Sequence, residues 1–263
     1  MNPESAETKW LIDEAAAMSA AERHRHWREV YAGERRDQVF SMTEDPGVQD
    51  RILDALATRG SLRVLVPGCG AATHLPQALA ERLPADSEIV CTDFVAEAIE
   101  QAEATFSHPR VSYRRHNTID VAALGNFDAV VIVNSILSDS DRENRAMLRA
   151  CADTLRQGGR LVGFFPTIYC ALEIATLERH PGKLANIDLP TSTCFEEEQG
   201  VRQVFYTPLH LRRVMREAGL AVHRMELFFC DSDHFAGQGR RLYQIFDEDL
   251  VPYEFFVVAD RVV

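Results

Sequence analysis

The sequence lacks long apolar runs, paired cysteine motifs and an excess of positive charge. No hydrophobic stretch reaches the roughly 20 residues needed to span a bilayer, and the opening MNPESAETKW lacks the hydrophobic segment of a secretory signal. The six cysteines lie far apart without a C-x-x-C pair, which excludes zinc-ribbon spacing and disfavours a disulfide framework. We therefore expect a cytoplasmic protein with no membrane partner and no metal site.

Positive charge is also scarce. Lys and Arg number 28 against 40 Asp and Glu, which gives a formal charge of −12. An average surface of this sign repels phosphate backbones, so we expect no nucleic-acid partner. The basic residues from Arg23 to Arg36 alternate with acidic ones and are interpreted as a solvated helix face. The expected partner is a small-molecule substrate, and the expected state is a monomer or homodimer.

The middle of the chain alternates two kinds of pattern. Short apolar runs predict strands at 62–67, 87–93, 111–115, 127–135 and 159–166. Amphipathic segments predict helices at 73–83, 95–106 and 140–157, with Thr73 as an N-cap and Gly158 as a C-cap. This alternation predicts parallel strands joined by crossover helices, which is an α/β fold.

The two ends of the chain read differently. Residues 8–59 predict helices broken near TEDPG at 43–47, and residues 167–200 look irregular, with several turn signals. The segment 207–219 predicts a helix with Thr207 as N-cap, Pro208 at its first position and Gly219 beyond its end. Two strand-like runs follow, at 220–230 and 252–260.

The segment VLVPGCGAATHL, at 64–75, ends a predicted strand in two glycines. A dinucleotide-binding turn has a third glycine where this chain has Thr73, and a P-loop needs a lysine that is absent here. The loop permits close approach to its backbone without the machinery that holds phosphates. This combination points to a nucleoside ligand without a pyrophosphate, and an ordinary tight turn is the alternative.

An acidic residue, Asp93, follows the glycine loop at the end of the next predicted strand. Asp93 ends the second predicted strand, where a carboxylate can accept hydrogen bonds from both hydroxyls of a ribose. The next residue, Phe94, can pack against a purine ring. The alternative role for Asp93 is to cap the helix that follows.

Five segments together resemble the class I S-adenosylmethionine-dependent methyltransferases, over about residues 60–166. They are VLVPGCGAATHL, IVCTDFVAEAIEQA, RRHNTID, FDAVVIVNSILSD and ADTLRQGGRLVGFF. The resemblance implies an α/β, Rossmann-like, doubly wound sheet of seven strands. Its order would be 3-2-1-4-5-7-6 with the seventh strand antiparallel, and an N-terminal helical extension would precede it. The implied domains are an N-terminal helical lid at 1–59 and a cofactor-binding domain at 60–263, with insertions at 167–206 and 231–251.

The resemblance also assigns roles around an S-adenosylmethionine cofactor. Gly68, Cys69 and Gly70 would line its methionine part, Asp93 would hold the ribose, and Phe94 would flank the adenine. Asn117 would accept a hydrogen bond from the adenine amino group, with Thr118 and Ile119 beside the ring, and Asn134 and Ser135 would lie beside the sulfonium.

Two of these positions depart from the family pattern. Asn117 stands where many members have an acidic residue, and an amide carbonyl accepts the same hydrogen bond. Pro67 replaces the usual acidic residue that orients the cofactor's ammonium group. That group must then be held by backbone carbonyls or by a lid residue.

Methyl transfer from a sulfonium is an in-line displacement with a neutral leaving group, so the enzyme's main task is alignment. A general base is needed only when the acceptor is a hydroxyl or a protonated amine. Candidate catalytic residues are Tyr169, which follows the fifth strand, and His234 in FFCDSDHFAG. The alternatives are an aromatic packed under the next helix for Tyr169 and a polar loop for His234. Trp27, Tyr31 and Phe40 recur near helical spacing and suit either sheet packing or a lid over the cofactor.

The expected function is methyl transfer to a nitrogen or oxygen atom of a small-molecule metabolite. The alternatives are a protein or RNA acceptor, other chemistry on the same fold, and a non-catalytic S-adenosylmethionine-binding protein. An oxidoreductase is disfavoured by Thr73 in place of the third glycine.

Overall fold

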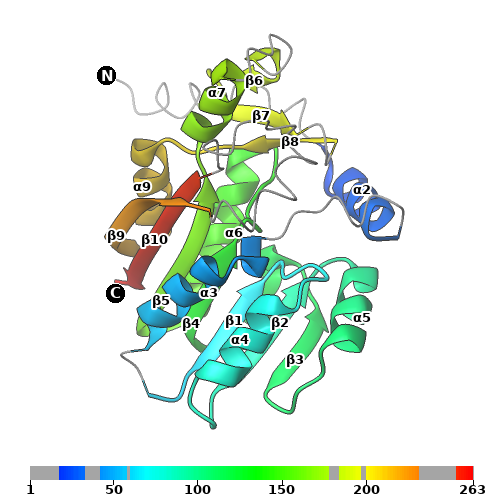
Figure 1. Cartoon of the computed structure of the whole chain (residues 1–263), viewed down its shortest axis with the longest axis vertical. Helices are drawn as coiled ribbons and strands as arrows, with labels where there is room; N and C mark the ends of the chain where they lie inside the picture. The colour runs from blue at the N-terminus through cyan, green and yellow to red at the C-terminus, as the bar shows by residue number, and fades with distance from the viewer. Residues whose placement is uncertain are drawn as a thin grey trace.

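A computed structural model describes residues 18–32, 42–57, 60–177, 184–196, 200–230 and 253–262. Seven strands form the main sheet in the order β3-β2-β1-β4-β5-β10-β9 (Figure 1). Their bounds are β1 Arg63–Pro67, β2 Glu88–Asp93, β3 Val111–Arg115, β4 Phe127–Val133, β5 Leu155–Pro166, β9 Leu220–Phe229 and β10 Tyr253–Arg261. The parallel pairs are β3 with β2, β2 with β1, β1 with β4, and β4 with β5, and β10 is antiparallel to both β5 and β9. The predicted order, with an antiparallel seventh strand, is confirmed.

Helices cover both faces of this sheet. Helices α3 (Pro46–Leu56) and α4 (His74–Arg82) pack on one face, and α6 (Asp141–Thr154) and α9 (Pro208–Glu217) pack on the other. Helix α5 (Ala96–Thr105) packs against β2 and β3 at the β3 edge of the sheet (Figure 1), and the 3₁₀ segment η5 (Thr118–Leu124) precedes β4. The fold is therefore a doubly wound, Rossmann-like α/β sheet.

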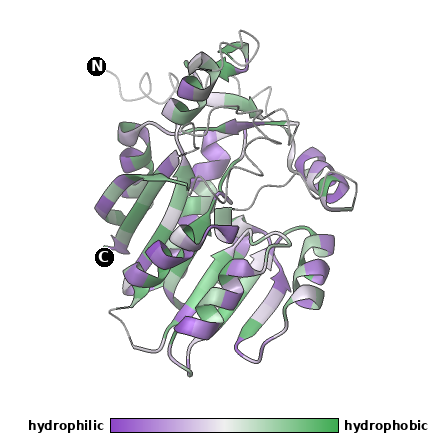
Figure 2. Ribbon diagram, in the orientation of Figure 1, coloured by the Kyte–Doolittle hydropathy of each residue, from purple (hydrophilic) through white to green (hydrophobic). Residues whose placement is uncertain are grey.

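The core follows from the two-residue period of the strands. In β1, Val64 and Val66 join the cluster under α3 and α4, while Leu65 joins the cluster under α6 and α9. In β5, Phe164 joins the cluster under α3 and α4, and the adjacent Phe165 joins the cluster under α6 and α9. Because both faces are buried, the inner stretches of the central strands are mostly apolar, and Figure 2 shows these strands among the most hydrophobic parts of the molecule.

Several predicted helix ends are confirmed and one is wrong. Thr207 caps α9 through its side chain, Pro208 is the first helical residue, and Gly219 follows with a φ of 80°. Thr73 occupies the N-cap position of α4, but its side chain makes no capping hydrogen bond. Gly158 is not a C-cap, because α6 ends at Thr154 and Gly158 lies inside β5 with a φ of 69°.

The segment after β5 is more regular than its turn signals indicated. It contains α7 (Ile168–Leu177) and a three-stranded antiparallel sheet of β6 (Ile187–Asp188), β7 (Thr193–Glu196) and β8 (Val201–Val204). We call α7 with β6–β8 the cap. It attaches to the main sheet at the carboxyl ends of β4 and β5, where Val204 N donates to Ser138 O (3.1 Å) and Tyr206 N to Pro166 O (2.8 Å). The cap thus stands above the edge where parallel sheets bind their ligands (Figure 1).

The N-terminal region is helical, as predicted, in its described parts. Helix α2 (Ala20–Ala32) lies near α5, and η4 (Met42–Glu44) leads into α3. The predicted break at 43–47 is present: Asp45 is the N-cap of α3, and its Oδ1 accepts from Gly47 N at 2.7 Å. In the described ranges, no helix combines the length and the apolar character that a bilayer crossing requires.

Candidate active site

The glycine loop joins β1 to α4 and is fastened to the end of β2. Gly68 and Gly70 have φ values of 62° and 59°, in the left-handed region that favours glycine. Between them, Cys69 N donates to Thr92 O at 2.9 Å, and Gly70 N donates to Asp93 Oδ2 at 3.0 Å. The loop and the acid that the sequence analysis linked are therefore in direct contact.

Both glycines also face close neighbours. A Cβ at Gly68 would stand 2.6 Å from the Cβ of Ser135, and a Cβ at Gly70 would collide with the hydroxyl oxygen of Tyr31. Only glycine allows the loop to approach the end of β4 on one side and α2 on the other. Burial raises the pKa of Tyr31 above its ordinary value, and the charges of Asp93 and Cys69 raise it further.

Asp93 is 5% exposed, and its carboxylate is held from two sides. Oδ2 accepts from Gly70 N, and Oδ1 accepts from Val95 N at 2.9 Å, at the start of α5. Burial raises the pKa of Asp93 despite the opposing backbone hydrogen bonds. Val95 is the N-cap of α5, so the Asp93 contact with Val95 N precedes the helix, and Asp93 is not its N-cap as the alternative interpretation had it. Each carboxylate oxygen keeps a second lone pair for another donor.

One face of α2 lies over this region. The His24 ring is 5.7 Å from the Phe94 ring, between centroids, and Trp27 and Tyr31 follow along the same face at 6.3 Å from each other. Gln101 Nε2, on α5, donates to Tyr31 O at 3.1 Å. The helix thus approaches both the acid-bearing turn and the glycine loop. Phe40, the third aromatic of the predicted pattern, lies outside the described residues.

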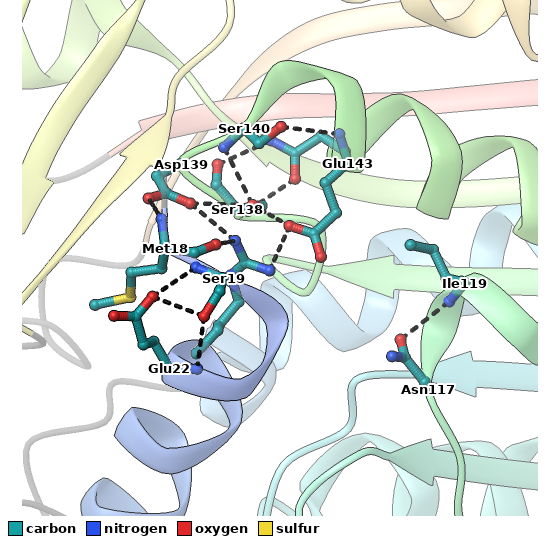
Figure 3. A network of polar contacts seen from close by, with 11 residues as sticks. Met18, Ser19, Glu22, Asn117, Ile119, Ser138, Asp139, Ser140 and Glu143 are labelled. Carbon is teal, nitrogen blue, oxygen red and sulfur yellow. Dashed lines mark hydrogen bonds and ion pairs between the residues drawn. The ribbon is translucent and has the colours of Figure 1, made fainter. Parts of the chain in front are cut away.

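The segment after β3 holds three further predicted residues. The Asn117 Oδ1 accepts from Ile119 N at 3.2 Å and caps η5, as Figure 3 shows. Thr118 is buried, whereas Ile119 is 38% exposed. An exposed isoleucine beside a free lone pair on an amide oxygen is compatible with a planar ring resting there.

Asn134 and Ser135 stand at the end of β4. Asn134 has a φ of 48°, which is unusual outside glycine and marks local strain. Its Nδ2 donates to Glu254 Oε1 at 2.5 Å and to Met42 Sδ at 3.1 Å. The Asn134 Oδ1 and the Ser135 Oγ are buried without a hydrogen-bond partner within the described part of the chain.

A polar network fastens α2 to the loop between β4 and α6 (Figure 3). Arg23 pairs with Asp139 at 2.9 Å and with Glu143, and Met18 N donates to Asp139 Oδ2 at 2.7 Å. The Arg23 side chain is only 13% exposed, so its assignment to a solvated face is wrong. The sequence held a signal for this helix start, because Ser19 and Glu22 form a capping box.

The two catalytic candidates remain predictions. Tyr169 lies in the first turn of α7, 44% exposed, at the carboxyl end of β5. His234 lies outside the described residues. Within the described ranges, no group of three or more His, Cys, Asp or Glu side chains is arranged to hold a metal ion.

The sheet order, the glycine loop and the acid after β2 define a class I methyltransferase architecture. Comparison with known proteins gives the same class: residues 64–159 match a family model described as a methyltransferase domain. A search of curated proteins finds no match. Residues 64–159, which run from β1 into β5, are thus similar to a methyltransferase domain and lie within a sheet of the class I methyltransferase fold.

Solved structures share this fold at low sequence identity. An S-adenosylmethionine-dependent methyltransferase from Anabaena variabilis ATCC 29413 has a TM-score of 0.64 at 13% identity, over 93% of this chain and 96% of its own. Magnesium protoporphyrin IX methyltransferase from Synechocystis PCC 6803 has 0.54 at 17%, over 90% and 93%. The N-methyltransferase NodS from Bradyrhizobium japonicum WM9 has 0.51 at 16%, over 82% and 94%.

Proposed function

We propose that this enzyme transfers the methyl group of S-adenosylmethionine to a nitrogen or oxygen atom of a small-molecule metabolite. The observation that carries the proposal is the double cover of the sheet's carboxyl edge. The cap attaches at Ser138 and Pro166, and α2 is fastened across the same edge by Arg23. A roofed site suits an acceptor small enough to be enclosed, with water excluded from the reacting atoms.

The residues at this edge fit the cofactor in two ways. Asp93 has lone pairs to accept from ribose hydroxyls next to Phe94, which would flank the adenine with Asn117, Thr118 and Ile119. The backbone at Gly68, Cys69 and Gly70 leaves room for the methionine part, and the buried, unpartnered Ser135 Oγ lies beside Gly68 in the described structure. Pro67 replaces the acidic residue that usually orients the cofactor's ammonium group, so another residue must hold that group. We propose Tyr31 for this role, because its hydroxyl lies beside Gly70 and can accept a hydrogen bond.

Charge supports a small acceptor over nucleic acid. With a formal charge of −12, the surface does not attract a phosphate backbone. Two of the similar structures are named for a magnesium protoporphyrin IX methyltransferase and an N-methyltransferase, which are compatible with the proposal. We further propose a cytoplasmic enzyme that acts as a monomer or homodimer, with residues 1–59 as its lid and residues 60–263 as its catalytic domain.

Transfer of a labelled methyl group tests the proposal. The protein is incubated with methyl-labelled S-adenosylmethionine and, in separate reactions, a metabolite extract, total RNA and a protein extract. We expect label in the metabolite fraction alone. Label confined to RNA or protein would overturn the small-molecule assignment.

A further inference from the structure

We infer that Asn134 and Glu254 form a positioning pair that selects a primary or secondary amine as the methyl acceptor. This inference rests on the proposed function and narrows it to one kind of acceptor atom. The inference starts from the Asn134 side-chain amide. Its nitrogen donates both of its hydrogens, whereas its oxygen accepts no hydrogen bond from the described residues.

The engaged end is well defined. Both hydrogens of Nδ2 have acceptors: Glu254 Oε1 at 2.5 Å and Met42 Sδ at 3.1 Å. A carboxylate accepts only from the NH₂ side of an amide, so this contact fixes which end of the amide is which. Glu254 is placed by the sheet itself, since it pairs with Pro166 where β5 ends.

The oxygen end is a buried acceptor in need of a donor. Asn134 Oδ1 has no hydrogen-bond partner among the described residues, and a buried acceptor without a donor destabilises the folded state. The backbone at Asn134 is also held at a φ of 48°. Two local costs on one residue at a strand end are the mark of a functional position.

The location of the pair assigns it to the acceptor and not to the nucleoside. Asp93 and Phe94 follow β2, on one side of the glycine loop. Asn134 and Glu254 lie on the other side, over β4, β5 and β10 and beneath the attachment of the cap. The next residue, Ser135, touches Gly68, so the pair is adjacent to the place where the sulfonium is proposed to lie.

The chemistry of the pair favours nitrogen over oxygen. The acceptor's nitrogen lone pair forms the bond to the methyl carbon as the carbon–sulfur bond breaks and its electrons return to sulfur. Positive charge then moves from sulfur to nitrogen, and the nitrogen keeps its proton until water removes it from the product. An N–H that donates to Asn134 Oδ1 is stabilised as this charge develops, because the Glu254 carboxylate polarises the amide through its nitrogen.

A hydroxyl acceptor has a different need. Its proton must leave as the new bond forms, which requires a base in contact with the acceptor oxygen. An amide oxygen is too weak a base for this, and Glu254 contacts the amide through Oε1 at the nitrogen end, away from the acceptor. The pair thus stabilises a cation without removing a proton, and the acceptor must retain at least one N–H.

The first test identifies the methylated atom. The protein is incubated with [methyl-¹³C]S-adenosylmethionine and a metabolite extract, and carbon–proton correlation spectra show which atom carries the label. We expect N-methyl products from primary or secondary amines. O-methyl or C-methyl products would overturn the inference and leave the proposed function intact, whereas label only in RNA or protein would overturn both.

The second test uses the amine so identified with two variants. Asn134→Gly removes the amide while suiting the positive φ, and Glu254→Gln removes the charge but keeps an oxygen acceptor. Glu226→Gln, on the neighbouring strand β9, makes the same chemical change at a 37% exposed side chain. We expect kcat to fall about 100-fold in Asn134→Gly and about tenfold in Glu254→Gln, while both variants bind S-adenosylmethionine as the wild type does. The Glu226→Gln control should keep the wild-type kcat. Wild-type kcat in both variants, or a loss that only follows weaker cofactor binding, would contradict the inference.

Discussion

The backbone N–H of Gly70 donates a 3.0 Å hydrogen bond to the carboxylate of Asp93, across 23 residues of sequence. One acid thus shapes the glycine loop and stands at the end of β2, where a ribose would lie. The same carboxylate also holds Val95 N at the start of α5. The hydrogen bonds that shape the loop and the lone pairs that we propose for the ribose thus belong to one buried carboxylate.

Asp93→Ala is expected to weaken S-adenosylmethionine binding by about 1 to 3 kcal/mol, because a buried hydrogen-bonding group is lost. Calorimetric titration measures this directly. Asp54→Ala, which changes an exposed carboxylate on α3, is the control and should bind as the wild type does. Equal affinity in the two variants would remove Asp93 from the site.

The raised pKa of Asp93 gives this prediction a pH signature. Burial raises the pKa of the Asp93 carboxyl above its ordinary value of 3.8, so this group is protonated at a higher pH in the folded protein than in the unfolded chain. S-adenosylmethionine affinity should therefore fall as the pH drops through the raised pKa, and it should be flat above it. Stability has the opposite sign: the native state binds the proton more tightly, so the contribution of Asp93 is greatest at low pH and is lost as the pH rises through its folded pKa.

Gly68→Ala is expected to abolish detectable S-adenosylmethionine binding and to destabilise the fold. The alanine backbone would have to keep the left-handed φ of 62°, which costs about 1 to 2 kcal/mol of folding free energy. Its methyl group would also lie 2.6 Å from the Ser135 Cβ. Gly158→Ala separates the two effects, since its φ is 69° and nothing lies within 4 Å of the added Cβ. Denaturant unfolding and calorimetry on both should show strain in each and lost binding only at Gly68. Equal behaviour would show that the contact with Ser135 is unimportant.

Arg23→Gln is expected to speed cofactor release. Without the guanidinium, Asp139 and Glu143 both lose their ion pair with residue 23, and these ion pairs tie α2 to the loop after β4 and the start of α6. Stopped-flow displacement of bound S-adenosylmethionine measures the release rate, and hydrogen exchange should rise in α2. Arg28→Gln, at an exposed position of the same helix, should leave both unchanged. Identical release rates in the two variants would argue against α2 as a lid.

Asp141→Asn is expected to lower the free energy of unfolding by about 1 to 2 kcal/mol, because its charged hydrogen bonds join α6 to α9. Oδ1 pairs with His210 Nε2 at 2.8 Å and Oδ2 with Arg145 Nε at 2.6 Å. Burial alone would raise the pKa of Asp141, but His210 and Arg145 outweigh it and hold the pKa below 3.8. This stability is therefore present above the ordinary value and is lost as the pH falls through the lower, folded pKa.

Denaturant unfolding at several pH values tests this prediction. The wild type should lose its advantage over Asp141→Asn only in strong acid. Asp153→Asn, near the end of the same helix and 50% exposed, should cost little. A penalty for Asp141→Asn that persists unchanged at the lowest pH would show that charge is not its cause.

The strands of the central sheet were predictable because their signals are local, whereas the order of the strands came from the family resemblance. The apolar runs of β1 and β4 and the turn at Gly68 follow from nearest-neighbour rules of burial and backbone freedom. Contacts between distant segments were not predictable in this way. The pairing of Arg23 with Asp139 spans 116 residues, and that of Asn134 with Glu254 spans 120.

The cap shows a different limit. Its strands are short, from two to four residues, and lie among turn residues, so no periodic pattern identifies them. Gly158 misled for a related reason: a glycine with positive φ ends many helices, but here it lies within β5, where the chain has already become extended. The general fold was thus predictable from the sequence, whereas the cap over the carboxyl edge of the sheet was not.

Calorimetry of the purified protein with S-adenosylmethionine, S-adenosylhomocysteine and NAD is the most direct test of the central claim. The account predicts one molecule of either sulfur nucleoside bound per chain, no heat from NAD, and weaker binding in Asp93→Ala. Binding of NAD with no response to S-adenosylmethionine would contradict it.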